Sequence, residues 1–593
     1  MPGCIVGRMT LERQDMYDLF MARYSGKARM HTNILLWAVL FTVLSLIVRP
    51  VKAQSDDYII VYRSHSHKQN MLNHPTFPVS RDFNIIPAVA AHLDANQVKQ
   101  LMANPDIEYI EPDYKIYVLG SPDINAYSSS GISALSSSQT IPYGISMVNA
   151  PAVWPRAKGA GVRVALMDTG ISMYHPDRGN VVASVSFAID SSNALIPVED
   201  FHGHGTHTSG TIAAADNDIG VVGVAPQADL LIAKVLDNTG SGQDSWVISG
   251  IEWAVNNNAK VISMSLGGPD YSAALDTACS NALAAGTLLV AAAGNDNVTT
   301  PFYPASLSSV ISVAAVDQSK NKASFSNFGP TIALAAPGVS VYSTVPISTD
   351  TSAAADAVWS STSHQSNMLT GTAPGSVTGQ ICNCGLADGS DPQDTCPDAV
   401  AGNIAHIRRG ITTFAAKVAH ARSKGAIGAI ISNNISGNFN GTLADGTPLV
   451  VVSISQADGD ALQILAQSGI SGTVSVTGNP YAYYSGTSMA CPHVAGVAAL
   501  IFSAAHYNIT PTEVSNILFD SAQDLGSPGR DDIFGHGLVD AYAALTLEKI
   551  NILAAFADNW LSTCSSPSWC EGMDTNHSGK VDFVDFATLT ENW

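Results

Sequence analysis

With 593 residues, the chain is too long for a single hydrophobic core, so several domains are expected. Charged residues make up only 13% of it and glycine is plentiful, which excludes a coiled coil or a disordered chain. The formal net charge of -21 argues against nucleic acid as a partner. Solubility or calcium binding would account for this acidity.

The N-terminal segment has the pattern of an export signal. Residues 34–48 carry no charge, basic residues precede them, and Val51-Lys52-Ala53 fits a small-x-small cleavage site. The alternative is an uncleaved anchor, but the run is shorter than the about 20 residues that span a bilayer. We therefore expect a signal peptide at 1–53, with Met30 as an alternative start, and a secreted or cell-surface protein.

A small α+β unit is predicted next. Residues 58–62 should form a strand, 95–102 a short helix, and 107–112 and 116–119 a second strand pair. The serine-rich stretch 128–138 resembles an exposed processing linker. This unit and its linker take up residues 54–137.

From residue 161 onward, apolar β-branched runs alternate with helical patterns. The predicted strands are 162–167, 228–235, 261–265, 287–292 and 310–316. Strands that are apolar on both faces and separated by helices indicate an α/β fold in three layers, a parallel sheet with helices on both faces. Ligand chemistry should then gather at the carboxyl ends of the strands.

This pattern is interrupted and then resumes. Segments rich in serine, threonine and asparagine, with one αβ unit at 414–434, occupy residues 348–477, and a strand-to-helix pattern returns at 483–504. An insertion into the α/β domain is the simplest account. The sequence thus places the two parts of that domain at 138–347 and 478–546.

The cysteines suit an oxidising compartment. Two groups are expected to form disulfides, with pairing left open: Cys382, Cys384 and Cys396 in one, and Cys564 and Cys570 in the other. A zinc site is the weaker interpretation, because the usual four-ligand spacing is missing. Cys279 and Cys491 are predicted to be buried free thiols.

Four short motifs carry groups suited to hydrolysis. Asp168 ends a predicted buried strand, His204 and Ser488 begin predicted helices, and Asn295 follows a strand. Amide hydrolysis by serine needs an imidazole that takes its proton and a carboxylate that fixes that imidazole. A helix N-terminus and a side-chain amide suit the developing oxyanion. We predict a catalytic Asp168, His204 and Ser488 with Asn295 in the oxyanion hole.

These motifs resemble those of the subtilisin-like serine peptidases, the subtilase or S8 family. The likeness runs over residues 138–345 and 481–544 and includes Tyr143-Gly144 and Gly535-His-Gly-Leu538. It implies an endopeptidase that acts on proteins or peptides through an acyl-enzyme and matures by self-cleavage between 119 and 139. By resemblance, the residues that hold substrate are Gly240, Ser241, Gly242, Ser265, Leu266, Gly267, Ala292 and Phe302. Phe302 should partly fill the P1 pocket.

The same resemblance implies a calcium site in this domain. Its matching positions are Gln139, Asp177 and Asn217 by their side chains and Ala215, Ile219 and Val221 by their backbone carbonyls. Oxygen ligands of this kind suit the six- to eight-fold coordination of calcium.

Two further modules show likenesses. Residues 109–114 resemble the inhibitory propeptide of these peptidases, whose terminal strand would occupy the active site as an intramolecular inhibitor. Residues 402–410, 414–417 and 425–434 resemble a protease-associated (PA) domain. In it, His406, Arg408 and Arg409 are interpreted as a solvated strand end.

The C-terminal segment 547–593 holds an EF-hand loop. Its positions are matched by Asp574, Asn576, Ser578, Gly579, Lys580, Asp582 and Asp585. The flanking stretches 553–560 and 586–593 align without gaps, which suggests a helical repeat and resembles a dockerin. Only one loop is intact, so a cohesin-like or cell-surface partner and a calcium-stiffened tag both stay open.

Two other functions fit the motifs less well. In a scaffold protein the catalytic module would be a relic, but all four catalytic positions are intact. An acidic carboxyl peptidase would need Glu in place of His204 and Asp in place of Asn295.

Overall fold

A computed structural model describes residues 56–122, 138–347, 353–387, 396–444, 446–505, 509–566, 569–570 and 573–590. Residues 57–593 belong to one structural unit. The predicted signal peptide and most of the linker lie outside the described residues.

The first domain is a small antiparallel sheet with two helices. Its elements are β1 (Asp57–Tyr62), α3 (His65–Asn73), β2 (Arg81–Phe83), β3 (Ala88–His92), α4 (Ala95–Met102) and β4 (Ile107–Pro112). The strand order is β2-β3-β1-β4. α4 begins where predicted because Asp94 and Gln97 form a capping box.

The predicted pairing of the last two strands of this domain is wrong. β5 (Lys115–Val118) does not pair with β4; it lies between β10 (Ser241–Gln243) and β12 (Leu266–Gly267) of the next domain. An extended segment pairs wherever an edge strand offers free N–H and C=O groups, and here those edges belong to the α/β domain.

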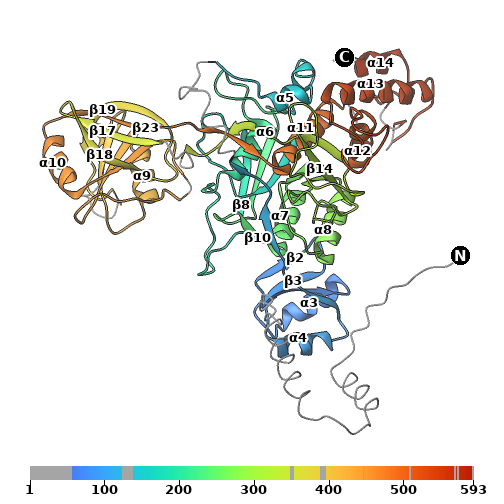
Figure 1. Cartoon of the computed structure of the whole chain (residues 1–593), viewed down its shortest axis with the longest axis horizontal. Helices are drawn as coiled ribbons and strands as arrows, with labels where there is room; N and C mark the ends of the chain where they lie inside the picture. Colours follow the sequence, from blue (N-terminus) through green and yellow to red (C-terminus); the bar gives the residue numbers. More distant parts are fainter. Residues whose placement is uncertain are drawn as a thin grey trace, which may run out of the picture. The chain divides into compact units, whose positions relative to one another are not determined.

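The α/β domain is built on a parallel sheet, as predicted (Figure 1), and this sheet has seven strands. Its order is β15-β14-β13-β11-β7-β9-β8, and every neighbouring pair is parallel. The strands are β7 (Arg163–Asp168), β8 (Asn180–Ser186), β9 (Asp229–Lys234), β11 (Val261–Met264), β13 (Leu288–Ala292), β14 (Val310–Val316) and β15 (Leu334–Pro337).

Alternate residues of one strand enter two separate cores, which makes three layers. Val164 and Leu166 of β7 pack with α6 (His204–Ala213), α11 (Thr487–Ala504), α12 (Pro511–Asp520) and α13 (Ala541–Asp558). Ala165 and Met167 pack with α7 (Asp244–Asn256) and α8 (Ala273–Ala284) on the other face. Among the described residues, α11 alone is long and apolar enough to cross a membrane, but it is buried in this core.

The insertion is a closed barrel placed inside a hairpin. It lies between β16 (Val341–Thr344) and β24 (Tyr481–Ser485), which pair with each other. The barrel order is β17-β18-β22-β21-β20-β19-β23. Its elements are β17 (Ala354–Trp359), β18 (Thr362–Met368), β19 (Gly375–Asn383), β20 (Ile404–Arg408), α9 (Phe414–Ser423), β21 (Gly428–Ser432), β22 (Val450–Ile454), α10 (Gln456–Ala466) and β23 (Ser471–Thr477).

The solvated strand end predicted in this barrel is wrong for His406. Its side chain is fully buried, with Nε2 3.0 Å from Ser432 Oγ, and burial lowers its pKa to about 4. Arg408 is exposed as predicted, whereas the guanidinium of Arg409 lies over the rings of Phe414 and Phe439. The side chain of His406 faces the interior of the protein from β20, so it is shielded from water.

Both cysteine groups contain a disulfide. Cys384 pairs with Cys396, and Cys564 pairs with Cys570. Cys279 and Cys491 are buried free thiols as predicted, and Cys382 is a third.

One continuous helix joins the α/β domain to the C-terminal module. Leu545 on α13 packs in the main core, while Ile552 and Phe556 further along it pack with the module. Glu548 is fully buried and pairs with Arg156 at 2.6 Å. The second helix of the module, α14 (Phe583–Thr590), overlaps the second stretch of the predicted helical repeat, 586–593.

Candidate active site

The carboxylate and the imidazole meet at the carboxyl end of the sheet. Asp168 is the last residue of β7, and His204 is the first residue of α6. Nδ1 of His204 lies 2.7 Å from Oδ1 of Asp168, and both side chains are fully buried. The hydroxyl of Thr208 donates to the other carboxylate oxygen at 3.0 Å. This arrangement leaves Nε2 of His204 without a partner among the described residues.

Ser488 lies at the start of α11, after a glycine that has no room for a side chain. A Cβ on Gly486 would come within 2.4 Å of the Leu119 carbonyl oxygen. The Ser488 hydroxyl donates to the Ser265 carbonyl at 2.8 Å. In this arrangement the Ser488 hydroxyl makes no hydrogen bond to His204, whose Nε2 has no partner among the described residues.

A peptide carbonyl of the chain itself lies between two N–H donors beside Ser488. The Leu119 oxygen accepts the backbone N–H of Ser488 at 3.1 Å and Nδ2 of Asn295 at 2.7 Å. The Asn295 amide is oriented by Thr487, whose N–H and hydroxyl donate to Oδ1 at 2.9 and 2.8 Å. Two converging donors of this kind stabilise negative charge on a carbonyl oxygen under attack.

The segment before this carbonyl lies between two strands of the α/β domain as an added strand. β5 pairs antiparallel with β10 on one side and β12 on the other. Val118 N–H donates to Gly240 O at 3.0 Å, and Leu119 N–H donates to Ser265 O at 3.4 Å. Ile116 is buried and Tyr117 is exposed, so alternate side chains enter the enzyme. The structure thus brings together the glycine-rich edges that the sequence singled out.

The ring of Phe302 lies against the backbones of Gly267 and Gly294. A Cβ on Gly267 would lie 2.7 Å from that ring, and one on Gly294 would lie 3.4 Å from it. Leu119 and Ala292 share a core cluster against which Phe302 packs. The ring therefore lies beside β12, in contact with the cluster that contains Leu119.

The chain continues past Leu119 on the far side of the site. Ser121 and Pro122 pair with Ser485 and Tyr484 of β24. Between them, a Cβ on Gly120 would lie 3.0 Å from Met489 Sδ and 3.3 Å from His204 Nε2. The peptide bond between Leu119 and Gly120 therefore lies beside both the serine and the histidine.

Sequence reasoning missed one buried carboxylate in this site, Asp200. It accepts five hydrogen bonds, from Thr169 Oγ1 (2.9 Å), His202 N (3.0 Å), Gly203 N (2.8 Å), Thr206 N (2.8 Å) and Thr206 Oγ1 (2.7 Å). These donors belong to the segment that carries His204 and to the residue after Asp168. An Asp four residues before the histidine was the available signal.

The predicted calcium residues partly converge. Nε2 of Gln139 lies 2.6 Å from Ala215 O and 3.1 Å from Val221 O, and Val221 N–H donates to Asp177 Oδ2 at 2.7 Å. The second oxygen of Asp177 is buried with no hydrogen-bond partner among the described residues, and burial raises its pKa to about 7. Asn217 instead accepts from Ile219 N–H at 3.2 Å, at the exposed part of the loop.

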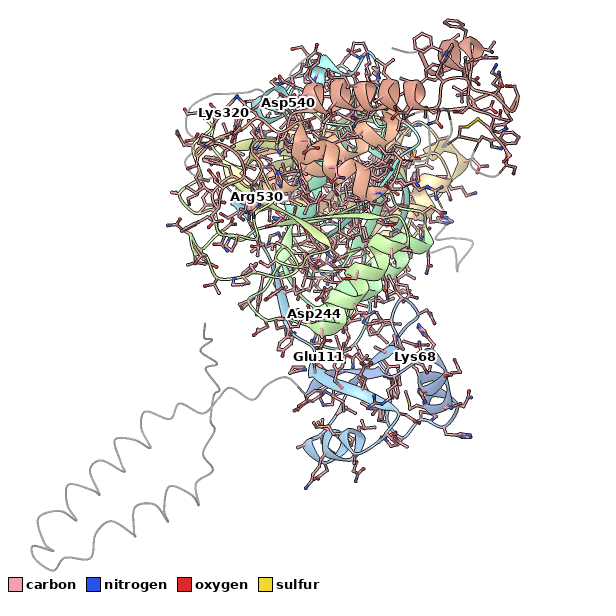
Figure 2. All side chains as sticks on the ribbon, turned by 90° about the vertical axis from the view of Figure 1, so that its right-hand side faces the viewer. Lys68, Glu111, Asp244, Lys320, Arg530 and Asp540 are labelled. Atoms are coloured by element: carbon pink, nitrogen blue, oxygen red, sulfur yellow. A yellow bond between two sulfur atoms is a disulfide. The ribbon has the colours of Figure 1, made fainter. Side chains whose placement is uncertain are left out.

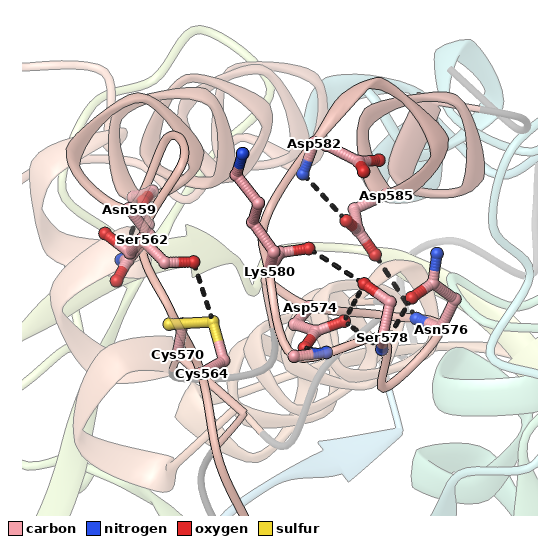
Figure 3. Close-up of a disulfide and its surroundings, with 12 residues drawn as sticks. Asn559, Ser562, Cys564, Cys570, Asp574, Asn576, Ser578, Lys580, Asp582 and Asp585 are labelled. Atoms are coloured by element: carbon pink, nitrogen blue, oxygen red, sulfur yellow. Dashed lines mark hydrogen bonds between the residues drawn. A yellow bond between two sulfur atoms is a disulfide. The ribbon is translucent and has the colours of Figure 1, made fainter.

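The C-terminal loop folds around its first and last carboxylates (Figure 3). Asp574 accepts the N–H groups of Ser578 and Gly579 at 2.9 and 2.8 Å, and Asp585 accepts those of Asn576 and Asp582 at 3.2 and 2.9 Å. Asp574 and Asp585 are fully buried. The Ser578 hydroxyl donates to Lys580 O at 3.0 Å. The Asp582 carboxylate does not fold into the loop as those of Asp574 and Asp585 do; it accepts the Val584 N–H at the start of α14.

A hydroxyl, an imidazole and a carboxylate at the edge of a parallel sheet, with a peptide carbonyl on two N–H donors, define a serine peptidase as the class of this protein. The chain belongs to the subtilase family, whose model matches residues 159–374 and 444–537. The PA domain model matches 377–462, and the peptidase inhibitor I9 model matches 54–119. The chain is thus a serine endopeptidase with an inhibitor-type propeptide and a PA insert.

Several known proteins are similar to it. Subtilisin NAT of Bacillus subtilis subsp. natto is 40% identical over 53% of this chain and 79% of its own length. The thermostable alkaline protease of Halalkalibacterium halodurans is 41% identical over 52% of this chain and 79% of its own. A crystal structure of the psychrophilic subtilisin-like protease Apa1 from Pseudoalteromonas sp. AS-11 is 32% identical, covering 69% of this chain and 97% of that one, with a TM-score of 0.44.

Proposed function

We propose that this peptidase is secreted, that Asp168, His204 and Ser488 carry its reaction with Asn295 in the oxyanion hole, and that it matures by cutting its own Leu119–Gly120 bond. The observation that carries the proposal is the Leu119 carbonyl on the two donors of Ser488 and Asn295. Two disulfides fit export to an oxidising compartment.

The reaction follows from the positions of the groups. Ser488 Oγ attacks the Leu119 carbonyl carbon while His204 Nε2 takes its proton, and the charge on the carbonyl oxygen is met by the two N–H donors. His204 then gives the proton to the Gly120 nitrogen, so the Leu119–Gly120 bond breaks and Leu119 remains as an ester on Ser488. Water, deprotonated by His204, hydrolyses the ester. Asp168 holds the imidazole throughout.

Self-cleavage is tested with Ser488→Ala in purified full-length protein. The variant should stay uncut, while wild type releases a fragment whose intact mass ends at Leu119. Ser503→Ala, on the same helix but distant from the reaction, should mature as wild type does. Maturation of Ser488→Ala at the wild-type rate without another protease would refute self-processing, and a fragment ending elsewhere would refute the assigned bond.

Calcium is proposed at two places. At the first, Asp177 and the carbonyls of Ala215 and Val221 would hold the ion, and the buried unpartnered oxygen of Asp177 supports this. The ion would neutralise the charge of this buried carboxylate. At the second, Asp574 and Asp585 would anchor the C-terminal loop. A cohesin-like or cell-surface partner for that module stays a prediction.

A further inference from the structure

Carboxylates of the propeptide meet the start of two enzyme helices. Asp113 accepts the Ser245 N–H of α7 at 2.9 Å. Glu111 accepts the Ser272 hydroxyl at 2.6 Å and the N–H groups of Ala273 and Ala274 at 3.0 and 3.1 Å, all at the start of α8. Each contact satisfies N–H groups that a helix leaves free at its first turn. These contacts hold the propeptide in place.

A third carboxylate in this cluster belongs to the enzyme, and no helix N–H group among the described residues donates to it. Asp244, the first residue of α7, is 2% exposed, and its Oδ2 has no hydrogen-bond partner among the described residues. Its backbone N–H donates to Tyr114 O at 3.0 Å, so the propeptide strand itself covers it. Figure 2 labels Glu111 and Asp244 close together, where the propeptide domain meets the helices of the α/β domain.

The charged groups that face Asp244 are themselves acidic. Burial, then Asp113, Glu111 and Asp270 raise the pKa of Asp244 well above its ordinary value, and Ser272 opposes this by hydrogen bonding. These described neighbours include no cation.

Asp113 is likewise buried in the contact. Burial raises its pKa to about 6, and the charge of Asp57 adds to this, while hydrogen bonds from Ser245 and the nearby Arg81 act in the opposite direction.

The raised pKa values of Asp113 and Asp244 couple propeptide binding to pH. Both carboxyl groups hold protons more tightly when the propeptide is bound than when water reaches them, so binding takes up protons. For Asp113 the favourable contribution is complete below its free pKa near 3.8 and is lost as pH rises through about 6. Above that pH, the contact between propeptide and enzyme buries carboxylates of like charge, those of Asp113 and Asp244.

We propose that Asp244 makes this end of the binding groove charge-selective, so that the cut propeptide, which places Asp113 and Glu111 beside it, leaves faster at neutral than at acidic pH. The proposal rests on the proposed self-cleavage after Leu119. Asp113 is the seventh residue on the amino side of that bond. A substrate with a neutral or basic side chain at this position escapes the repulsion, and the enzyme's own inhibitor does not.

The first test is Asp113→Asn, which alters only the propeptide and leaves the mature enzyme identical. Purified precursor is followed from pH 4.5 to 8 by gel for the cut and by a fluorogenic peptide for activity. The delay between cut and activity measures release, and any effect of pH on the peptidase reaction itself cancels, because the mature enzyme is the same in both proteins. At pH 7.5 the variant should release its propeptide on the order of 100-fold more slowly than wild type, with little difference at pH 4.5.

The matched control is Glu108→Gln, an exposed acid on the same strand as Glu111, which should behave as wild type does. The second test uses mature enzyme and peptides with the sequence of residues 114–122 preceded by Asp, Asn or Lys. At pH 7.5 kcat/KM should be roughly tenfold lower for Asp, and Asp244→Asn should remove that difference.

The outcomes separate the two proposals. A precursor that is never cut would refute self-cleavage. A normal cut followed by release that ignores pH, or that Asp113→Asn leaves unchanged or accelerates, would overturn the charge selectivity alone. Equal cleavage of the Asp and Lys peptides at pH 7.5 would overturn it as well.

Discussion

Asp200→Asn should separate the positioning of His204 from the chemistry it performs. The Asp200 carboxylate holds the segment that leads into α6, accepting two hydrogen bonds from Thr206 on one oxygen and three on the other. An amide placed there turns an NH₂ group toward at least two donors. Each lost hydrogen bond to a charged acceptor is worth about 1.5–3 kcal/mol, so the segment loses about 3–6 kcal/mol before it relaxes.

That loss should appear both in folding and in the reaction. We expect a free energy of unfolding lower by about 3 kcal/mol and a kcat lower by roughly 100-fold, with KM little changed, because the groove of Gly240 to Gly242 is untouched. Unfolding is measured by urea in a Ser488→Ala background, which prevents self-digestion. The kinetics use a fluorogenic peptide across pH, because a displaced His204 also shifts the pH–rate profile.

Asp190→Asn is the control for this substitution. Asp190 is exposed and accepts three hydrogen bonds within its own turn, from Ser192 and Ala194, so kcat should stay within a factor of two. If Asp200→Asn lost stability but kept the wild-type kcat and pH profile, the positioning argument would be wrong.

Three further outcomes follow from the site. Gly120→Val should slow the first cut at least tenfold by gel, because a Cβ there meets Met489, whereas Ser121→Val should not; equal rates would contradict this contact. Phe302→Gly should raise kcat/KM for Phe relative to Leu at P1 by about tenfold, and an unchanged ratio would show that the ring does not limit the pocket. Asp177→Asn should abolish the loss of thermal stability that a chelator causes in the catalytic domain, while Asp585→Asn should preserve it.

Local pattern predicted the α/β domain well because its strands are buried on both faces. Residues such as Val164 to Met167 have to be apolar at every position, since the two sides of β7 enter two cores. The four motifs that we propose as catalytic also stand where the sequence placed them, at strand ends and helix starts. The order of strands in the sheet needed the structure.

Non-local partners explain what the sequence left undetermined. The sequence shows that 115–118 is extended but not that its partners are β10 and β12, which are more than a hundred residues away. The bond to be cut could be assigned only once the Leu119 carbonyl was seen on Asn295. His406 was misplaced for the same reason, since burial depends on how the barrel closes.

Under the proposed self-cleavage, cutting the chain and activating the enzyme are two distinct events. Breaking the Leu119–Gly120 bond removes none of the hydrogen bonds that hold β5 between β10 and β12, nor the contacts of Glu111 and Asp113 with the two helices. What it removes is the covalent link, so the propeptide changes from an intramolecular occupant to one whose departure dilutes it irreversibly. Release therefore sets the time at which activity appears. The repulsion proposed at Asp244 would act on that step without changing the hydrogen bonds to the Leu119 carbonyl, on which the proposed first cut depends.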